Sequence, residues 1–411
     1  MITYKEAINI LSNALQPLPD FKIASEQAHG VLARDVISTE EVPNFSNSAM
    51  DGFAVRSVET NGANEDNPVR LEVRGCILAG ELAPAIDQKE SCCEIMTGSV
   101  MPTGFDAVIP VEQVEITDEG GRAFIVINQS VQTGRNVRFS GEDFKPGQVV
   151  AKKGQLLNPH ILMAINANKI ESVSVYRPPN IGILTTGSEL ESVNQEENSP
   201  TIPNTNGPFL QSSIRRMGIP CNGMVSVGDS SQVIVEKIQD FMGLGSDIII
   251  ISGGVSAGKA DFVPGALNTL GAEILFHKVW IRPGKPILMA KLSTGQFVFG
   301  LPGNPVSVAV GFRFFVNQAI RILQDQALEE SISAINKNEF KKPEKFCFFA
   351  KAQTGYTQSG NLEAEILSGQ ESFKLSPFYQ ANSWMILPEG TDVIKAGEKI
   401  EIMPLQPGEA I

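Results

Sequence analysis

The sequence has only three histidines, His29, His160 and His277, and they lie far apart. A histidine-based metal centre or a Ser-His-Asp triad needs imidazoles next to other reactive groups, so we expect all three to have structural roles. Cysteine offers little more, because the five cysteines form no C-x-x-C pair and the adjacent Cys92 and Cys93 lack the spacing of zinc ligands. Such an odd, scattered set of thiols fits a reducing cytoplasm.

Basic residues are fewer than acidic ones. The chain has 33 lysines and arginines and 46 aspartates and glutamates, which gives a formal net charge of -13. Nucleic acids and anionic membranes bind basic surfaces, so neither is an expected partner, although a local basic pocket is compatible with this balance. Long apolar runs are also missing, since no stretch approaches the ~20 apolar residues of a membrane helix. Residues 1–16 place Ile8, Leu11 and Leu15 at helical spacing, which predicts a folded helix and not a secretion signal.

The composition that is present predicts a globular chain of several domains. Hydrophobic residues make up 42% of the 411 positions, and a chain of this length exceeds what one hydrophobic core usually serves. Changes of pattern predict an α/β multidomain protein in four parts: an elongated helical and linker module (1–40 plus 139–176), a β-rich insertion (41–138), a parallel α/β core (177–325) and a C-terminal β-barrel (326–411). In the first part, Ser25 is placed to cap a helix through Ala33.

The α/β core contains apolar runs, in NIGILTTGSEL, SDIIIISGGVSAG and GQFVFGLPGNPVSVAVGF, that each lead into a polar loop and then a helical stretch. Continuous apolar strands of this kind are typical of a parallel sheet buried on both faces. Ligands bind such sheets beyond the carboxyl ends of the strands, where loops and helix starts meet. The three loops therefore form one candidate site.

Small and acidic residues follow the first two of these strands. The first loop contains Gly187 and Glu189, and Glu189 suits either a helix cap or a Mg²⁺ ligand. The second begins Ser252-Gly253-Gly254 and reaches Asp261, and its small residues let backbone amides approach a phosphate closely. Asp229, after another apolar run, could join these carboxylates around a metal or be a structural cap. Any one loop could be a plain tight turn, but the set favours a ligand site.

The third loop, Pro302-Gly303-Asn304-Pro305, places Asn304 as a helix N-cap with proline in the first turn, a geometry that receives anions. Before it, the turn Arg282-Pro283-Gly284-Lys285-Pro286 holds two cations on a rigid backbone. Rigid cations suit a polyanionic ligand, and the alternative is a solvated basic turn.

The second loop also resembles a phosphate-binding P-loop, because Gly253 to Lys259 reads G-x-x-x-x-G-K. Ala260 stands where the motif needs a hydroxyl, and Pro264-Gly265 is expected to interrupt the following helix. The pattern therefore disfavours a nucleotide triphosphatase.

The motifs NSAMDGFAV, IMTGSVMP, GED, TTGSEL, SGGVSAG, RPGKP and GLPGNPVS, in this order, resemble those of the molybdenum insertases, which include a bacterial enzyme and the C-terminal domain of gephyrin. The resemblance covers all of the chain but the terminal barrel. It implies an α/β core of the molybdopterin-binding type and a homodimer whose site lies between the core of one subunit and the insertion of the other. The implied reaction converts adenylylated molybdopterin and molybdate to the molybdenum cofactor, with Mg²⁺-dependent release of AMP. A transient contact with the adenylyltransferase that supplies the substrate is also implied.

The family motifs also imply the site residues, matched position by position. The implied catalytic residues are Asp51, Glu189, Asp229, Asp261 and Lys285, and Mg²⁺ would be held by Glu189, Asp229 and Asp261. The implied substrate-binding residues are Thr97, Arg138, Gly187, Ser252, Gly253, Gly254, Arg282, Pro302, Gly303, Asn304, Pro305 and Ser372. Arg282 departs from the family, which usually has lysine there, and Lys259 occupies a position that is usually acidic.

Two other functions stay open beside this one. The related adenylyltransferase usually carries S-G-G-T-G where this chain has Ser252-Gly253-Gly254-Val255-Ser256, and it lacks the NSAMDG insertion. A paralogue that keeps the fold as a scaffold without catalysis is the second alternative, and the retained carboxylates and Lys285 argue against it. The sequence does not distinguish molybdate from tungstate.

Overall fold

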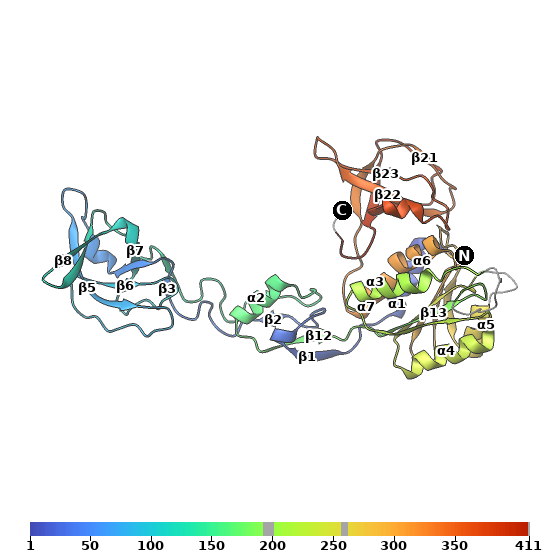
Figure 1. The fold of residues 1–411 in the computed structure, drawn as a ribbon, viewed down its shortest axis with the longest axis horizontal. Helices are drawn as coiled ribbons and strands as arrows, with labels where there is room; N and C mark the ends of the chain where they lie inside the picture. Colours follow the sequence, from blue (N-terminus) through green and yellow to red (C-terminus); the bar gives the residue numbers. More distant parts are fainter. Residues whose placement is uncertain (192–200, 256–261, 410–411) are drawn as a thin grey trace. The chain divides into compact units, whose positions relative to one another are not determined.

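The computed structural model describes residues 1–191, 201–255 and 262–409. The chain divides into two compact units, one formed by Met1–Phe21 with Val175–Ile411 and the other by Lys22–Ser174 (Figure 1). Each unit has its own sheets and its own apolar cores.

The first unit is built on a six-stranded sheet. Its strands lie in the order β14 (Cys221–Val227), β13 (Ile181–Thr186), β15 (Ile248–Ser252), β19 (Phe297–Leu301), β18 (Leu288–Lys291) and β16 (Glu273–His277). The first four are parallel, and β18 is antiparallel to both of its neighbours, β19 and β16. The carboxyl ends of β13, β15 and β19 meet at one edge, as the strand-loop-helix pattern predicts.

Helices cover both faces of this sheet, since its central strands β13, β15 and β19 are mainly apolar and buried at every position. Along β15, Ile248 and Ile250 pack with α1 (Tyr4–Ala14), α3 (Asn206–Arg216), α6 (Pro305–Gly311) and α7 (Asn317–Leu323). Ile249 and Ile251 face the other way, toward α4 (Ser231–Gly243) and α5 (Phe262–Thr269). The two groups of helices lie on opposite sides of the sheet in Figure 1.

The N-terminal helix confirms the expectation for residues 1–16. Thr3 and Glu6 form a reciprocal capping box at the start of α1, and Leu11 and Leu15 are buried in the sheet's larger core. Such a box satisfies two amides that the first turn would otherwise leave unpaired.

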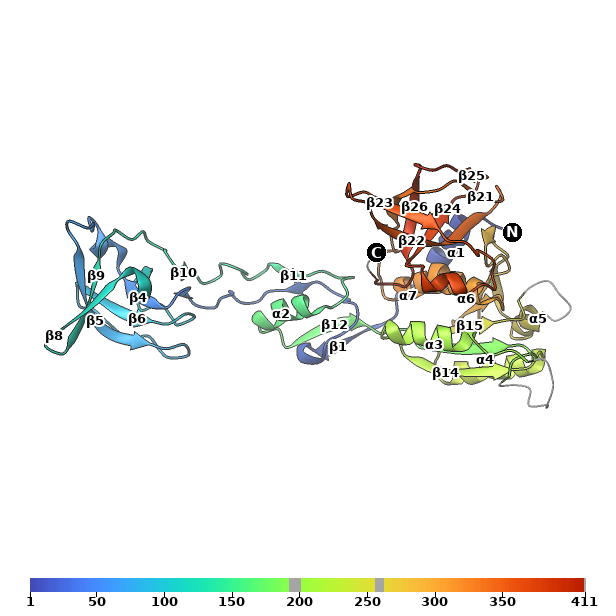
Figure 2. The ribbon, with the colours of Figure 1, turned by 45° about the horizontal axis from the view of Figure 1, so that its top comes forward.

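The longest helical run corrects the expectation that no membrane-length apolar segment exists. Residues Pro305–Leu323, which join α6, a π-helical turn (Phe312–Val316) and α7, are long and apolar enough to cross a membrane, but 89% of the segment is buried inside the fold. Its core side chains pack against sheet residues on one side and against Phe349 and Trp384 on the other. It is therefore the helix between the sheet and the C-terminal domain (Figure 2).

The C-terminal domain is a closed β-barrel, as expected. Five strands pair in a ring: β22 (Cys347–Tyr356), β23 (Leu362–Ile366), β20 (Ile332–Asn336), β26 (Lys399–Pro404) and β24 (Ser383–Leu387), which returns to β22. A further strand, β17 (Ile281–Arg282), pairs in parallel with the start of β22, and β21 (Phe340–Lys341) pairs with β25 (Val393–Ile394). A 3-10 turn, Ser376–Tyr379, lies between β23 and β24. Because β17 leads into the Arg282–Pro286 turn, this pairing places the basic turn beside the barrel.

The second unit contains an all-β domain of six strands in the order β7 (Ala107–Pro110), β4 (Gly52–Val55), β6 (Ser91–Ile95), β5 (Val69–Ile77), β9 (Arg122–Ile127) and β8 (Glu115–Glu119). Two 3-10 turns, Ser57–Thr60 and Val111–Gln113, follow β4 and β7. Smaller pairs join β3 (Asn47–Ser48) to β10 (Val137–Arg138), β2 (Val36–Ile37) to β11 (Val149–Ala151), and β1 (Asp20–Ala24) to β12 (Ser172–Tyr176). One helix, α2 (Pro159–Ala167), is capped by Asn158.

Two local predictions of helices are wrong. The helix expected from Ser25 to Ala33 is only a 3-10 turn, Ser25–Gln27, because Gly30 takes a positive φ of 91° and the Ser25 hydroxyl bonds to the Ile170 carbonyl instead of capping. Conversely, Pro264 and Gly265 do not interrupt a helix, since α5 runs from Phe262 to Thr269. Proline is tolerated there because it lies in the first turn, where an amide needs no partner.

Candidate functional site

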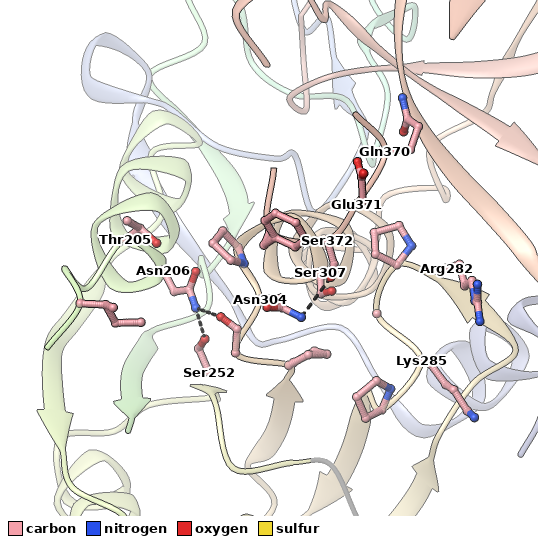
Figure 3. A pocket seen from close by; sticks show the side chains of 18 of the residues that line it. Thr205, Asn206, Ser252, Arg282, Lys285, Asn304, Ser307, Gln370, Glu371 and Ser372 are labelled. Atoms are coloured by element: carbon pink, nitrogen blue, oxygen red, sulfur yellow. Dashed lines mark hydrogen bonds between the residues drawn. The ribbon is translucent and has the colours of Figure 1, made fainter. Parts of the chain in front are cut away.

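A cavity of about 1240 Å³ opens between the carboxyl edge of the α/β sheet and the barrel. Its walls come from the loops after β13 and β19, the last residue of β15, the turn after β17, the start of α3, and the barrel segment 367–373 (Figure 3). Most of the α/β-side residues predicted for the site line this cavity: Glu189, Ser252, Arg282, Lys285, Pro302, Gly303, Asn304 and Pro305. Ser372 lines it from the barrel side.

Asn206 ties two of the predicted loops together at the start of α3. Its Nδ2 donates to Ser252 Oγ at 2.9 Å and to the Gly303 carbonyl at 2.7 Å, as the dashed lines in Figure 3 show. The sequence motifs alone do not point to this residue. The polar run Pro203-Asn204-Thr205-Asn206 at the start of a helix resembles the three candidate loops and is the pattern that could have indicated it.

Gly253 is required by the close approach of the loops after β13 and β15. It has a φ of 103°, and a Cβ there would lie 2.4 Å from the carbonyl oxygen of Thr186. The buried Thr186 hydroxyl has no hydrogen-bond partner in the described chain. Gly254 also has a positive φ, of 62°. The two glycines are therefore conformational requirements of the loop that begins after β15, and neither of them lines the cavity itself.

The start of α6 differs from the predicted anion-receiving helix end. Asn304 is the N-cap residue, but its side chain makes no capping bond and instead donates from Nδ2 to Ser372 Oγ at 3.0 Å. The Ser372 carbonyl accepts from the Val306 amide at 3.1 Å, and Pro305 has no amide hydrogen to offer. The barrel therefore supplies the cap that Asn304 was expected to provide.

Arg282 and Lys285 are exposed at the cavity wall formed by the turn after β17. The Arg282 guanidinium lies 4.8 Å from the centroid of the Phe346 ring, and Lys285 Nζ lies 5.9 Å from that of Trp280. Neither cation has an ion pair with a carboxylate in the described ranges. Aromatic faces orient these cations without neutralising them, which suits an anionic ligand.

The predicted metal ligands occupy neighbouring strand ends but form no complete set. Glu189 follows β13, and Asp229 follows β14, which pairs with β13 in parallel. The Asp229 carboxylate accepts from the Ser188 amide at 3.1 Å, and the Ser188 hydroxyl accepts from the Asp229 amide at 3.2 Å. Asp261 lies outside the described residues, and those that are described contain no cluster of three potential metal ligands.

Three predicted residues lie in the second unit, around the short strand β3. Asp51 Oδ1 accepts from both the Thr97 amide and the Thr97 hydroxyl, each at 2.7 Å. These two bonds hold the pKa of the exposed Asp51 carboxyl below its usual value. Arg138 on β10 pairs with Asn47 on β3 and is exposed. Asp51 and Thr97 are thus in direct contact, and Arg138 is held on a strand that pairs with β3.

The fold and the cavity define an α/β ligand-binding domain joined to a barrel and a β-rich unit, and family profiles match each part. Residues 182–322 match a probable molybdopterin binding domain, residues 2–167 the MoeA N-terminal region (domain I and II), and residues 333–405 the MoeA C-terminal region (domain IV). The chain belongs to the MoeA family of molybdopterin molybdenumtransferases, which are transferases of molybdenum cofactor biosynthesis.

Individual relatives cover nearly the whole chain. A molybdopterin molybdenumtransferase of Synechococcus elongatus is 33% identical over 98% of this chain and 100% of its own length. The protein of the same name from Bacillus subtilis is 33% identical over 92% of this chain and 88% of its own. The solved structure of the molybdopterin biosynthesis moeA protein from Pyrococcus horikoshii OT3 matches with a TM-score of 0.81 and 28% identity over 98% of this chain and 100% of that one.

Proposed function

We propose that this protein transfers molybdenum to molybdopterin, with adenylylated molybdopterin and molybdate as its substrates and AMP as a product. The observation that carries this proposal is the cavity of about 1240 Å³, which is lined both by Arg282 and Lys285 and by the loops at the sheet's carboxyl edge. A polyphosphate and an oxyanion both need unneutralised cations, and the chain's net charge of -13 makes this local basic turn exceptional.

The residues of the cavity suit hydrolysis of an adenylylated phosphate. Water adds across the phosphoanhydride, the P–O bond to the adenylyl group breaks, and AMP leaves with an additional negative charge. Arg282 can bind phosphate oxygens with two parallel donors, whereas Lys285 offers a point charge to the leaving oxygen. The proposed role of Asn304 and Ser372 is to bind and orient the polar end of the pterin substrate.

We propose Mg²⁺ as the metal of the reaction. The donors fit it in type, because carboxylate oxygens at the ends of the paired strands β13 and β14 are hard ligands that Mg²⁺ prefers. Glu189 and Asp229 would hold it together with Asp261. When bound, Mg²⁺ would neutralise phosphate charge and orient the substrate.

The working assembly is proposed to be a cytoplasmic homodimer, in which Asp51, Thr97 and Arg138 of one subunit complete the cavity of the other. Support comes from the local arrangement of these residues. Two hydrogen bonds from Thr97 favour the ionised form of the Asp51 carboxyl, and Asp51 is exposed and belongs to no hydrophobic core. A transient contact with the adenylyltransferase would pass the substrate on without release into water.

The test is AMP release by the purified protein from adenylylated molybdopterin with Mg²⁺, with and without molybdate. The proposal predicts molybdate-stimulated AMP release that stops when Mg²⁺ is chelated. Tight binding of the pterin without any AMP release would instead support the non-catalytic paralogue, and AMP release in the presence of chelator would remove Mg²⁺ from the account.

A further inference from the structure

Lys351 is an unusual residue of the barrel, because its side chain is completely buried although it carries a charge. It lies on β22, opposite Trp384 of β24. Its ammonium group donates to the Gly369 carbonyl at 2.8 Å, to the Lys374 carbonyl at 2.9 Å and, more weakly, to the Glu371 carbonyl at 3.5 Å. The Phe378 ring lies 5.5 Å from it. A buried ammonium is costly unless such acceptors surround it.

The backbone of Lys351 also forms hydrogen bonds with the segment that carries these carbonyl groups. Its amide donates to Gln370 Oε1 and its carbonyl accepts from Gln370 Nε2, each at 2.9 Å. The Leu367 amide also donates to the Lys351 carbonyl, at 3.1 Å. One residue of the barrel therefore fixes the segment 367–374, called here the Ser372 loop, through both its main chain and its side chain.

The Ser372 loop reaches the cavity wall of the α/β domain. Ser372 accepts from Asn304 Nδ2 through its hydroxyl and from the Val306 amide through its carbonyl. The loop is thus hydrogen-bonded to Lys351 on the barrel side and to the start of α6 on the other side. In Figure 3, Gln370, Glu371 and Ser372 descend along the cavity toward Asn304 and Ser307.

We propose that Lys351 is a positioning residue, which holds the Ser372 loop against the start of α6 and so sets the shape of the cavity for its substrate. The proposal rests on the proposed function in assigning the cavity to substrate. It goes beyond that function because Lys351 itself does not line the cavity. The alternative, a purely structural lysine of the barrel, predicts that its loss lowers stability without a specific effect on the loop.

Titration of Lys351 provides a readout that separates the two. Burial lowers the pKa of Lys351 to about 8, an effect opposed by the Glu371 carboxylate and reinforced by Lys374, the two charged groups that face it from the loop. As pH rises through about 8, the ammonium loses one of the three donors that its carbonyl acceptors share, so the loop should loosen. The unfolded chain then holds more protons than the folded one, so this group's contribution to global stability rises over the same pH range. Loop order and global stability should therefore change in opposite directions.

The first experiment measures hydrogen exchange of the segment 367–374 in the wild type, in Lys351→Met and in the control Lys342→Met. Lys342 is also a buried barrel lysine and donates to the Phe346 carbonyl at 2.9 Å, but it has no hydrogen bond to the Ser372 loop. We expect faster exchange of the loop in Lys351→Met alone, and in the wild type a loss of protection near pH 8 beyond the ordinary rise of amide exchange with pH. Equal exchange in both variants would overturn the proposal. This measurement does not depend on any enzymatic activity.

The second experiment is a double-mutant cycle on AMP release with Lys351→Met and Ser372→Ala. Misplacing a positioned group by about 1 Å costs up to ~100-fold in rate, so each single variant should lose roughly 10- to 100-fold in kcat/KM, and the double variant should lose little more than either one. Independent, multiplicative losses would contradict the proposal. If Lys351→Met does not fold, Gln370→Ala releases the same loop from the same strand and takes its place in both experiments. Absence of AMP release in the wild type would refute the proposed function but leave the exchange result as the test of Lys351.

Discussion

At the scale of single residues, Asp51 has two possible roles that the structure allows to be separated. Its carboxylate clamps the turn that carries Thr97, and it is also proposed to act at the site. Asp51→Asn keeps the size and one acceptor oxygen but removes the charge. We expect AMP release to be abolished while dimerisation and thermal unfolding stay close to wild type, because the residue is exposed and outside any core.

Asp118→Asn is the matched control for that variant. Asp118 is exposed in the same unit and its carboxylate accepts from the amide of Gly121 at 3.2 Å, so it also clamps a turn. Full activity in both variants would show that Asp51 is only a turn residue.

Lys285 is the second residue whose charge can be tested directly. A charge-assisted contact to phosphate contributes about 1.5–3 kcal/mol, so Lys285→Ala should weaken binding of the adenylylated pterin by roughly 10- to 100-fold. The loss should shrink as salt is raised, because screening weakens the same interaction. Lys291→Ala, at the end of β18 and outside this cavity, is the control. Unchanged affinity in Lys285→Ala would make the turn a solvated basic surface.

At the scale of elements, Asn206 links α3 to the loops after β15 and β19. Loss of its two hydrogen bonds in Asn206→Ala should lower the free energy of unfolding by about 1–2 kcal/mol and also reduce AMP release, since both bonds shape the cavity wall. The measurements are urea unfolding followed by Trp fluorescence, and kcat/KM.

Asn222 provides a closely matched control, because it lies near the start of β14, at the amino-terminal ends of the strands. Its Nδ2 donates to the Leu244 carbonyl at 3.0 Å and to Ser246 Oγ at 2.9 Å, which repeats the pattern of one carbonyl and one serine. Asn222→Ala should lose similar stability and keep its activity. If the two variants lose activity equally, the effect of Asn206 is one of stability alone.

The elements also show what the sequence can predict. Apolar continuity in β13, β15 and β19 was enough to predict a buried parallel sheet and a site at its carboxyl edge, because these features depend on local pattern. The Asn206 contact with Gly303 joins residues 97 positions apart, and the cap that Ser372 gives to α6 depends on where the barrel packs. Such contacts are set by tertiary structure, and the Ser25 helix failed for the same reason, since Ser25 Oγ found a partner on Ile170.

At the scale of the whole molecule, the proposed shared site predicts complementation between two impaired variants, assayed at a substrate concentration too low to occupy Lys285→Ala. In a two-fold dimer that carries Asp51→Asn in one subunit and Lys285→Ala in the other, a shared arrangement puts both changes in one site and leaves the second site intact. Random mixing of the two variants by joint refolding or coexpression should therefore restore about a quarter of wild-type AMP release. If every site is built from a single subunit, no activity returns.

We propose that AMP release drives the insertion of metal, and this coupling is measured most directly by counting molybdenum in the pterin product for each AMP released. Purified protein would be given adenylylated molybdopterin, Mg²⁺ and molybdate, with Lys285→Ala as the impaired comparison. We expect one molybdenum per AMP in the wild type and a parallel fall of both in the variant. AMP release that leaves the pterin without molybdenum would contradict this coupling, because the protein would then be a hydrolase of the activated pterin and not a molybdenumtransferase.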